Sequence, residues 1–327
     1  MNRKAVSGIK LTLLLLGMLA LYGRSIHACL PLPDVLWDYS ASGDHVNCLK
    51  AIKDINGDGK QDVIVGSIYN FGVSCFSGDT GTPLWSQFVE GWVLSLALIE
   101  DVDNDGKQDI VAGTDYPDPG IKCLSGLTGT TLWSYSTLTS LYMYAGMHNG
   151  VTSVCAINAV NGDGWKGVVA ATEGSEILCV DGKNGSLIWS HIFNGYVRTV
   201  LNVGDVDNDG KQDVVVVLRR LLEDNRFGTY CFSGGNGTII WSWVDNGEAS
   251  GGSVIDDVDQ DLMKDIVIGV NWTHVICISG SSGSSVWMYL LPPKHFVDVM
   301  KGIDDVNADG KPEVVVGGGE KIVCISG

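Results

Sequence analysis

Positive charge is scarce in this sequence of 327 residues. It holds 21 lysines and arginines against 38 acidic residues, which gives a formal net charge of −17. Because no basic patch is available to neutralise phosphates, a nucleic-acid partner is excluded. Charged residues make up only 18%, whereas glycine occurs 43 times. This composition is typical of many short strands and tight turns and argues against long solvated helices.

Long apolar runs are missing after the N-terminus, so no later segment reaches the roughly 20 apolar residues of a membrane-spanning helix. Residues 1–28 have the pattern of a signal peptide, with a positively charged start, an apolar stretch over 11–22 and the small residue Ala28 before a cut. We therefore expect a secreted or cell-envelope, extracellular protein whose domain spans 29–327 and which does not span the membrane after cleavage. An uncleaved anchor and a lipid anchor on Cys29 are the alternatives.

Sustained helical periodicity is also absent, and a repeat of about fifty residues stands in its place. Each unit holds, in order, an Asp-rich loop, a Cys-x-Ser-Gly-like segment and a turn that leads to a tryptophan. In the first unit these landmarks begin at Asp54, Cys75 and Trp85. The cysteines recur at 123, 179, 231, 277 and 324, and the tryptophans at 133, 189, 241 and 287.

Each unit is expected to form four strands. Short β-branched runs such as Val214–Val217 lie between turn residues, a pattern that indicates buried strands. Four-stranded units repeated at this length predict a propeller, in which radial repetition leaves only short sheet edges. The sequence therefore predicts an all-β, six-bladed β-propeller of four-stranded antiparallel blades.

The two ends of the repeat array complement each other. The last unit stops at Gly327, where a tryptophan strand should follow, and Val35–Asp38 contain such a strand, with Trp37, but no unit before it. We therefore expect the N-terminal strand to complete the last blade and close the ring. A longer array with further blades beyond Gly327 is the alternative.

The Asp-rich loops have the oxygen pattern that calcium prefers, since this ion takes six to eight hard oxygen ligands. The first, third and fifth side chains can converge on one point, and a glycine at the sixth position permits the reversal. The seventh residue adds its peptide oxygen and the ninth side chain completes the shell. A strand follows each loop and the twelfth-position Glu is absent, so these are not EF-hands. The predicted ligands are Asp54, Asn56, Asp58, Lys60 and Asp62; Asp101, Asp103, Asp105, Lys107 and Asp109; Asp205, Asp207, Asp209, Lys211 and Asp213; Asp257, Asp259, Asp261 and Asp265; and Asp305, Asn307, Asp309, Lys311 and Glu313.

Five loops are near-complete, so about five Ca²⁺ ions are expected. One of the five has Leu262 where glycine is expected, which predicts a strained turn. The remaining loop, 159–167, begins with Ala159 and ends with Gly167, lacks the first and ninth carboxylates, and is predicted to be empty. Three or four carboxylates in one loop would repel one another without a cation, so simple polar turns are the weaker alternative. Because the loops join strands within blades, we expect the calcium to be structural.

Two halves of the unit resemble known repeat families. The Asp-x-Asp/Asn-x-Asp-Gly-x-x-Asp loop before a Val-Val-Gly strand, best seen at 101–113 and 305–317, resembles the FG-GAP or VCBS repeats of integrin-α-type propellers. The Cys-x-Ser-Gly-x-x-Gly-x-x-x-Trp half, as at 123–133, resembles the blade turn of PQQ-like, quinoprotein-like repeats. The resemblance covers nearly all of 35–327. It implies a propeller with calcium in the acidic loops, but much less about activity, because propellers host many functions.

The cysteines and the periodic tryptophans are interpreted as packing residues. The six periodic cysteines occupy equivalent positions in neighbouring blades, too far apart to bridge, and are expected to be small buried residues. Cys48 and Cys155 lie outside this register, and their pairing stays open. The periodic tryptophans are expected to pack between blades.

Aromatic residues also gather in the connections on the face opposite the acidic loops. Long aromatic connections on a rigid scaffold are where binding usually occurs, so we expect a protein or carbohydrate ligand there. Capping of the disc by these rings is the alternative. The candidate ligand-face residues are Trp92, Tyr142, Tyr144, Trp243 and Trp272.

No catalytic motif accompanies these features. The six histidines are scattered, and neither a His-Glu-x-x-His nor a Gly-x-Ser-x-Gly motif is present. We therefore assign no catalytic residue and expect a ligand-binding, adhesion or scaffold module rather than an enzyme. A quinone-dependent dehydrogenase or a polysaccharide-acting propeller is the alternative.

Overall fold

The structure, a computed structural model, describes residues 35–41, 43–69, 72–137, 149–158, 160–193, 195–221, 226–292 and 297–327. The chain divides into two compact units, Met1–Asp38 and Tyr39–Gly327. In the first unit, the described residues 35–38 form no strand. The predicted signal peptide and Cys29 lie outside the described residues.

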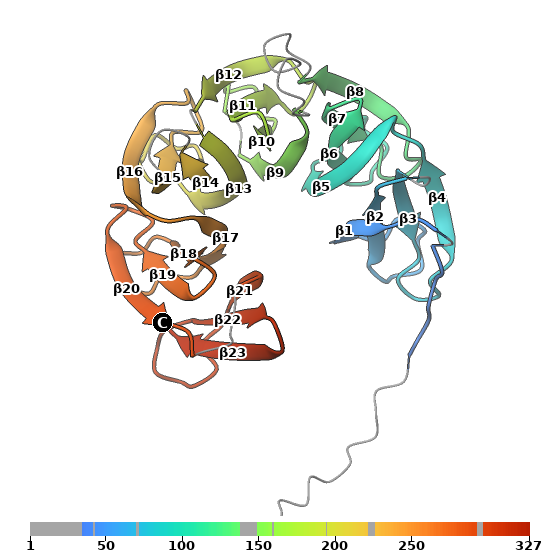
Figure 1. Ribbon diagram of the computed structural model, residues 1–327. Coiled ribbons are helices and arrows are strands. Elements are labelled where there is room, and N and C mark those ends of the chain that lie inside the picture. Colours follow the sequence, from blue (N-terminus) through green and yellow to red (C-terminus); the bar gives the residue numbers. More distant parts are fainter. Residues whose placement is uncertain are drawn as a thin grey trace, which may run out of the picture. The chain divides into compact units, whose positions relative to one another are not determined.

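The second unit contains six antiparallel sheets whose strands follow sequence order, as Figure 1 shows. The first three are β1 (Val46–Ile52), β2 (Asp62–Ser67), β3 (Val73–Phe76) and β4 (Pro83–Gln87); β5 (Gly91–Ile99), β6 (Asp109–Pro117), β7 (Gly120–Leu124) and β8 (Thr131–Ser136); and β9 (Val151–Ile157), β10 (Gly167–Thr172), β11 (Glu176–Asp181) and β12 (Leu187–Ile192). The last three are β13 (Gly195–Gly204), β14 (Asp213–Leu221), β15 (Arg226–Phe232) and β16 (Ile239–Asn246); β17 (Ala249–Ile255), β18 (Asp265–Val270), β19 (His274–Ile278) and β20 (Ser285–Leu290); and β21 (Val299–Ile303), β22 (Glu313–Gly318) and β23 (Lys321–Ser326).

This arrangement confirms the prediction of an all-β, six-bladed propeller. The first strands of successive blades contact one another, β1 with β5, β5 with β9, and onward to β21. The described ranges contain no helix of the length and apolar character needed to cross a membrane.

The second strands of the inner blades are covered on both faces. Every residue of β10 and β18 is buried, and apart from Asp265 at the start of β18 both strands consist of small and β-branched side chains. Such runs suit a strand with a sheet packed on either side. Five buried apolar clusters lie between successive blades, from the first pair to the last. The core is therefore a series of inter-blade layers.

The periodic tryptophans join neighbouring blades, as expected. The indole N–H groups of Trp85 and Trp133 donate to the carbonyl oxygens of Gly126 and Gly182 in the next blade, at 2.9 and 2.8 Å. Trp189 and Trp241 make the same bond to Gly234 and Gly280. Each ring also lies against the turn glycine of the next blade. Their contact partners are Gly129, Gly185, Gly237 and Gly283.

Five periodic cysteines are buried, whereas Cys324 is exposed, contrary to expectation. Each buried cysteine pairs across the sheet with the tryptophan of the fourth strand, as Cys75 does with Trp85. The sixth sheet has three strands in the described part, so β23 lacks such a cover. Cys48 and Cys155 are half-buried and unbridged. Closure of the ring by Val35–Asp38 stays a prediction.

Candidate metal-binding loops and ligand face

Each acidic loop joins the first strand of a blade to the second, and its first side chain closes the turn. The Asp101 carboxylate accepts backbone N–H bonds from Asp105 at 3.0 Å and Gly106 at 2.8 Å. The turn requires a φ of 88° at Gly106, and Leu262 adopts 74° at the equivalent place. A leucine in this left-handed region costs about 1–2 kcal/mol, which is the predicted strain. Corresponding bonds are accepted by Asp54, Asp205, Asp257 and Asp305.

The ninth side chain ties the loop to the turn after the third strand. Asp109 is fully buried, and its two carboxylate oxygens accept N–H bonds from Val102 at 2.6 Å and Gly126 at 2.9 Å. This carboxylate therefore belongs to the fold whether or not an ion binds. Glu313 accepts only the first of these bonds, and its buried Oε1 has no partner among the described residues. The pair of bonds recurs at Asp62, Asp213 and Asp265.

The fifth carboxylate faces the serine of the Cys-x-Ser-Gly segment. Ser125 donates to Asp105 at 3.1 Å, and Ser326 donates to Asp309 at 2.8 Å. Ser77 and Ser279 make the matching bonds to Asp58 and Asp261. The fifth carboxylate also accepts the peptide N–H of the seventh residue. These donors are Lys60, Lys107, Lys211, Met263 and Lys311. Sequence reasoning missed the serines, although the repeat contains them.

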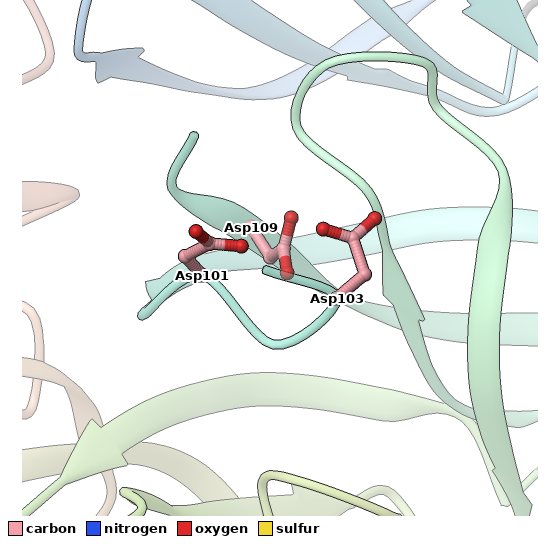
Figure 2. A group of neighbouring side chains, drawn as sticks. All are labelled: Asp101, Asp103 and Asp109. Atoms are coloured by element: carbon pink, nitrogen blue, oxygen red, sulfur yellow. The ribbon is translucent and has the colours of Figure 1, made fainter. Parts of the chain in front are cut away.

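In three of the loops, the first, third and ninth carboxylates lie close together. One oxygen from each of Asp101, Asp103 and Asp109 lies within 4.8 Å of the other two (Figure 2). The same holds for the sets Asp205, Asp207 and Asp213, and Asp257, Asp259 and Asp265. In the last loop the converging set is Asp305, Asp309 and Glu313, because Asn307 occupies the third position. The ninth side chain, expected to complete the shell, belongs to all four of these sets. The full ligand sets remain a prediction.

Burial, with a smaller contribution from neighbouring carboxylates, raises the pKa of two ninth-position side chains. Burial raises the pKa of Asp109 to about 6, backbone N–H bonds from Gly126 and Val102 oppose this, and the charges of Asp103 and Asp105 add to it. The pKa of Asp265 rises to about 6 for the same kinds of reason. A cation among these oxygens would relieve the repulsion that the neighbouring carboxylates cause.

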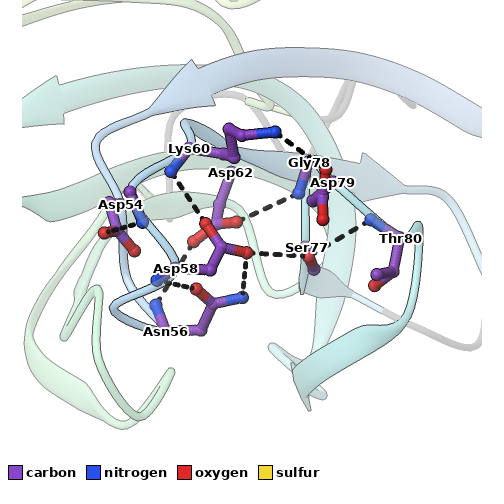
Figure 3. Close-up of polar contacts among 10 residues, drawn as sticks. Asp54, Asn56, Asp58, Lys60, Asp62, Ser77, Gly78, Asp79 and Thr80 are labelled. Atoms are coloured by element: carbon purple, nitrogen blue, oxygen red, sulfur yellow. Dashed lines mark hydrogen bonds and ion pairs between the residues drawn. The ribbon is translucent and has the colours of Figure 1, made fainter.

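The first loop is held by amide contacts instead. Asn56 donates its side-chain N–H to Asp58 at 2.9 Å, and Asp58 accepts the N–H of Lys60 (Figure 3). The backbone N–H of Gly59 holds the pKa of Asp54 below its usual value. The third position of this loop is therefore an amide that bonds the fifth-position carboxylate. The predicted ligands of the loop remain Asp54, Asn56, Asp58 and Asp62.

The third loop, predicted to be empty, has Gly167 in place of the ninth carboxylate and is held by different contacts. Buried Val160 lies where a side chain on Gly167 would point. Asp181 replaces the serine of the Cys-x-Ser-Gly segment and accepts an N–H from Asn161 at 2.9 Å. The amide of Asn161 also donates to Asp163. A neutral donor therefore lies between these two carboxylates, while Ala159 falls outside the described residues.

The ligand-face residues lie at the opposite ends of the strands. Trp92, at the start of β5, packs edge-on between Tyr69 and Tyr116 with ring centroids 6.4 and 6.0 Å away. Trp243 on β16 is half-buried against Phe227. Trp272 is 48% exposed in the turn between β18 and β19. Sequence reasoning missed the tyrosines of this aromatic run, which extends to His45 beside Tyr69. Tyr142 and Tyr144 lie outside the described residues.

Comparison with known proteins identifies a family for this chain. The family described as outer membrane protein assembly factor BamB matches residues 59–289 and, in a second overlapping match, 158–327. The chain belongs to this family. The PQQ-like half of the resemblance is thereby confirmed, whereas the FG-GAP or VCBS half remains a prediction. Among curated proteins, none matches the chain at a significant level.

Solved structures share the fold at low sequence identity. BamB from Moraxella catarrhalis is 13% identical with a TM-score of 0.52, covering 82% of this chain and 71% of its own. The Vibrio cholerae (V. cholerae) biofilm matrix protein Bap1 is 22% identical with a TM-score of 0.54, and the match covers 78% of this chain but 41% of Bap1. The quinohemoprotein alcohol dehydrogenase of Comamonas testosteroni is 10% identical with a TM-score of 0.52. The match covers 79% of this chain and 55% of the dehydrogenase chain. At these identities the likeness shows the fold alone, which an assembly factor, a matrix protein and an enzyme share.

Proposed function

We propose that this protein is an exported binding or scaffold propeller of the cell envelope or its surroundings, with calcium structural in five loops. The observation that carries the proposal is the recurrence of one acidic loop at the same place in successive blades. In four of these loops, oxygens from three carboxylates lie within 4.8 Å of one another. Membership of a family named for outer membrane assembly supports an envelope location.

The contacts of the loops support a structural role for the ion. The ninth carboxylate bonds the loop start to the turn after the third strand, as Asp109 does between Val102 and Gly126. The fifth bonds the serine beside that turn, as Asp105 does with Ser125. A cation held among these oxygens would connect three strands of one blade, because the same carboxylates touch all three segments. Loss of the ion would leave their repulsion unopposed.

The ligand is proposed to bind at the other end of the blades. Tyr69 and Tyr116 are 52% and 51% exposed and flank Trp92, while Trp272 is exposed two or more blades away. Exposed aromatic rings on a rigid scaffold provide large contact areas at low entropic cost, which suits protein or carbohydrate ligands. Alanine in place of Trp92 should weaken ligand or cell-surface binding without changing the calcium response.

The experiment compares thermal unfolding in millimolar calcium with unfolding in excess chelator. An ion that binds only the folded state at 100 times its dissociation constant stabilises by about 2.7 kcal/mol per site. We expect a large drop in midpoint with chelator. Asp103→Asn should lower the calcium-loaded midpoint, whereas Asp163→Asn in the third loop should not. An unchanged midpoint in chelator would refute the structural role.

A quinone-dependent enzyme is the second candidate, because the fold is shared with a quinohemoprotein dehydrogenase. The periodic cysteines lie in separate blades, and no two cysteines are adjacent in the sequence, so the chain lacks a vicinal pair for a quinone. This feature gives the enzyme interpretation no support from the cysteines. Incubation with pyrroloquinoline quinone followed by desalting should leave no quinone absorbance on the protein, and retained absorbance would favour the enzyme.

A further inference from the structure

Four arginines follow residue 28 in the sequence, and all of them lie in the fourth blade. Arg198 is on β13, Arg219 and Arg220 end β14, and Arg226 begins β15. In a chain of net charge −17, this concentration of guanidinium groups in one blade is the strongest local departure from the overall charge. It lies at the end of the blade opposite the acidic loop, because β14 begins at Asp213 of that loop.

Strand irregularities direct two of these arginines. The register between β13 and β14 shifts on both sides of Val197, so that Arg198 and Arg219 have no paired residue across the ladder. A second shift in the next blade leaves Ser250 unpaired between β17 and β18. Bulges re-aim side chains and are frequent beside functional sites. Blades one, two and three shift at the same end, but their bulges carry no basic residue.

The two bulged arginines form the wall between two cavities. The larger, about 260 Å³, lies between blades three and four and includes Thr152, Glu173 and Tyr196 in its lining. The smaller, about 140 Å³, lies between blades four and five and includes Ser250 and Trp272. Arg198 and Arg219 line both. Drug-sized ligands occupy pockets from about 300 Å³ upward, so each cavity suits a ligand unit of one ring.

Hydrogen-bond donors remain available at this wall. Arg198 donates Nε to the carbonyl of Ser250 at 2.9 Å, and its terminal nitrogens have no partner among the described residues. The carboxylate oxygens of Glu248 lie 3.4 Å from a terminal nitrogen of Arg219 and 3.5 Å from one of Arg220, which are long distances for ion pairs. The buried Nε of Arg220 and Oγ of Ser250 also lack partners in the described part of the chain. A carboxylate would fit these donors, because guanidinium groups bind it through paired, charge-assisted hydrogen bonds.

Trp272 adds a planar apolar ring to the smaller cavity, and its backbone is strained. Asn271 and Trp272 have φ of 49° and 63°, and the N–H of Thr273 bonds the carbonyl of Val270, which defines a tight hairpin turn. Such turns favour Asn-Gly, so tryptophan at the second position is held in a backbone conformation that side chains other than glycine and asparagine rarely adopt. The ring is nevertheless half-exposed at the cavity. Strain retained at a ligand-facing position is typical of functional sites.

We propose that Arg198, Arg219 and Trp272 bind a uronate unit of an acidic saccharide, with the carboxylate on the guanidinium groups and the sugar ring on the indole. The inference rests on the proposed ligand-binding function and specifies its ligand. A sugar presents both a carboxylate and a flat C–H face, which matches a guanidinium wall beside an indole. The lining offers few apolar side chains to anchor a peptide, with Val197 and Ala249 the aliphatic ones. The aromatic run at Tyr69, Trp92 and Tyr116 lies at the same end of earlier blades.

The test is calorimetric titration of the calcium-loaded chain with a β-1,4-glucuronan tetramer and with cellotetraose, which differ only in the carboxylates. We expect the glucuronan to bind at least tenfold more tightly. Arg219→Ala and Arg198→Lys should each weaken glucuronan binding at least tenfold, since lysine keeps the charge but loses the fork. Trp272→Ala should weaken it as well. Lys264→Ala is the matched control, because it removes an exposed positive charge beside the acidic loop of blade five and should have no effect.

Each other outcome overturns the proposal. Equal affinity for cellotetraose would show that the site does not recognise the carboxylate. Tighter binding of a pentaglutamate peptide would show that the ligand is an acidic peptide and not a saccharide. No binding of glucuronan at millimolar concentration would reject the site. The thermal midpoint in calcium is measured on the same samples, so failure of the saccharide is distinguished from failure of the calcium-dependent fold.

Discussion

At the scale of single residues, the carboxylates of one loop have different tasks. Asp101 closes the turn, Asp105 faces a serine of the neighbouring segment, and Asp109 is buried with both oxygens bonded to backbone N–H groups. Asp103 makes the fewest contacts within the chain, accepting an N–H from Asp105. The third position is therefore the one whose carboxylate is most open to an ion.

Replacement of the buried carboxylate tests the first of these tasks. Asp109→Asn places an amide N–H₂ against a backbone N–H donor, which leaves buried polar groups unpaired. We expect a loss of about 1–3 kcal/mol in the free energy of unfolding, measured by urea titration in calcium. Asp79→Asn, at an exposed residue paired with Lys60, should change it by less than about 0.5 kcal/mol. Equal effects of the two substitutions would contradict the role given to Asp109.

At the scale of elements, the repeat predicted the strands because the same signals recur in every unit. Asp-rich loop, cysteine strand and tryptophan strand follow one another as expected, and the indole bonds explain why tryptophan and glycine keep their spacing. The arginine wall was not predicted, because Arg198 and Arg219 come from two different strands and only the register shift between these strands brings them together. The role of Asp181 was also missed, since it depends on a contact across the blade.

The turn glycines provide a test of blade-to-blade packing. Gly237 has a φ of 72°, and a Cβ there would lie 2.7 Å from the ring of Trp189 in the preceding blade. Gly237→Ala should therefore cost at least about 1 kcal/mol. Gly251→Ala is the control, because the position is open and its backbone is extended. The measurement is the thermal midpoint of each variant, and equal midpoints would contradict the packing account.

At the scale of the whole molecule, the predicted ring closure depends on whether residues 35–38 add a fourth strand beside β23. Each buried cysteine faces the tryptophan of its own blade. If the predicted closure holds, Trp37 would be the corresponding partner of Cys324 on β23. Trp287 lies on β20 of the fifth blade, and its buried indole nitrogen has no partner in the described residues. Closure would bring the sixth blade to the same cover as the other five.

Thiol labelling tests closure directly. Burial raises the pKa of Cys75 to about 12 and that of the half-buried Cys48 and Cys155 to about 11, so these thiols should react slowly with iodoacetamide at pH 8. If residues 35–38 cover β23, Cys324 should be equally slow, and Trp37→Ala should speed its labelling. Peptide mapping gives each rate. Labelling of Cys324 at the rate of unfolded chain, unaffected by Trp37→Ala, would contradict closure.

We propose that one divalent ion holds each complete loop together. Native mass spectrometry of the chain equilibrated with calcium and then exchanged into volatile buffer counts the bound ions. The account predicts five, falling to four in Asp103→Asn and remaining five in Asp163→Asn. A chain that carries no calcium, or an Asp103→Asn variant with the same count as the parent, would contradict it.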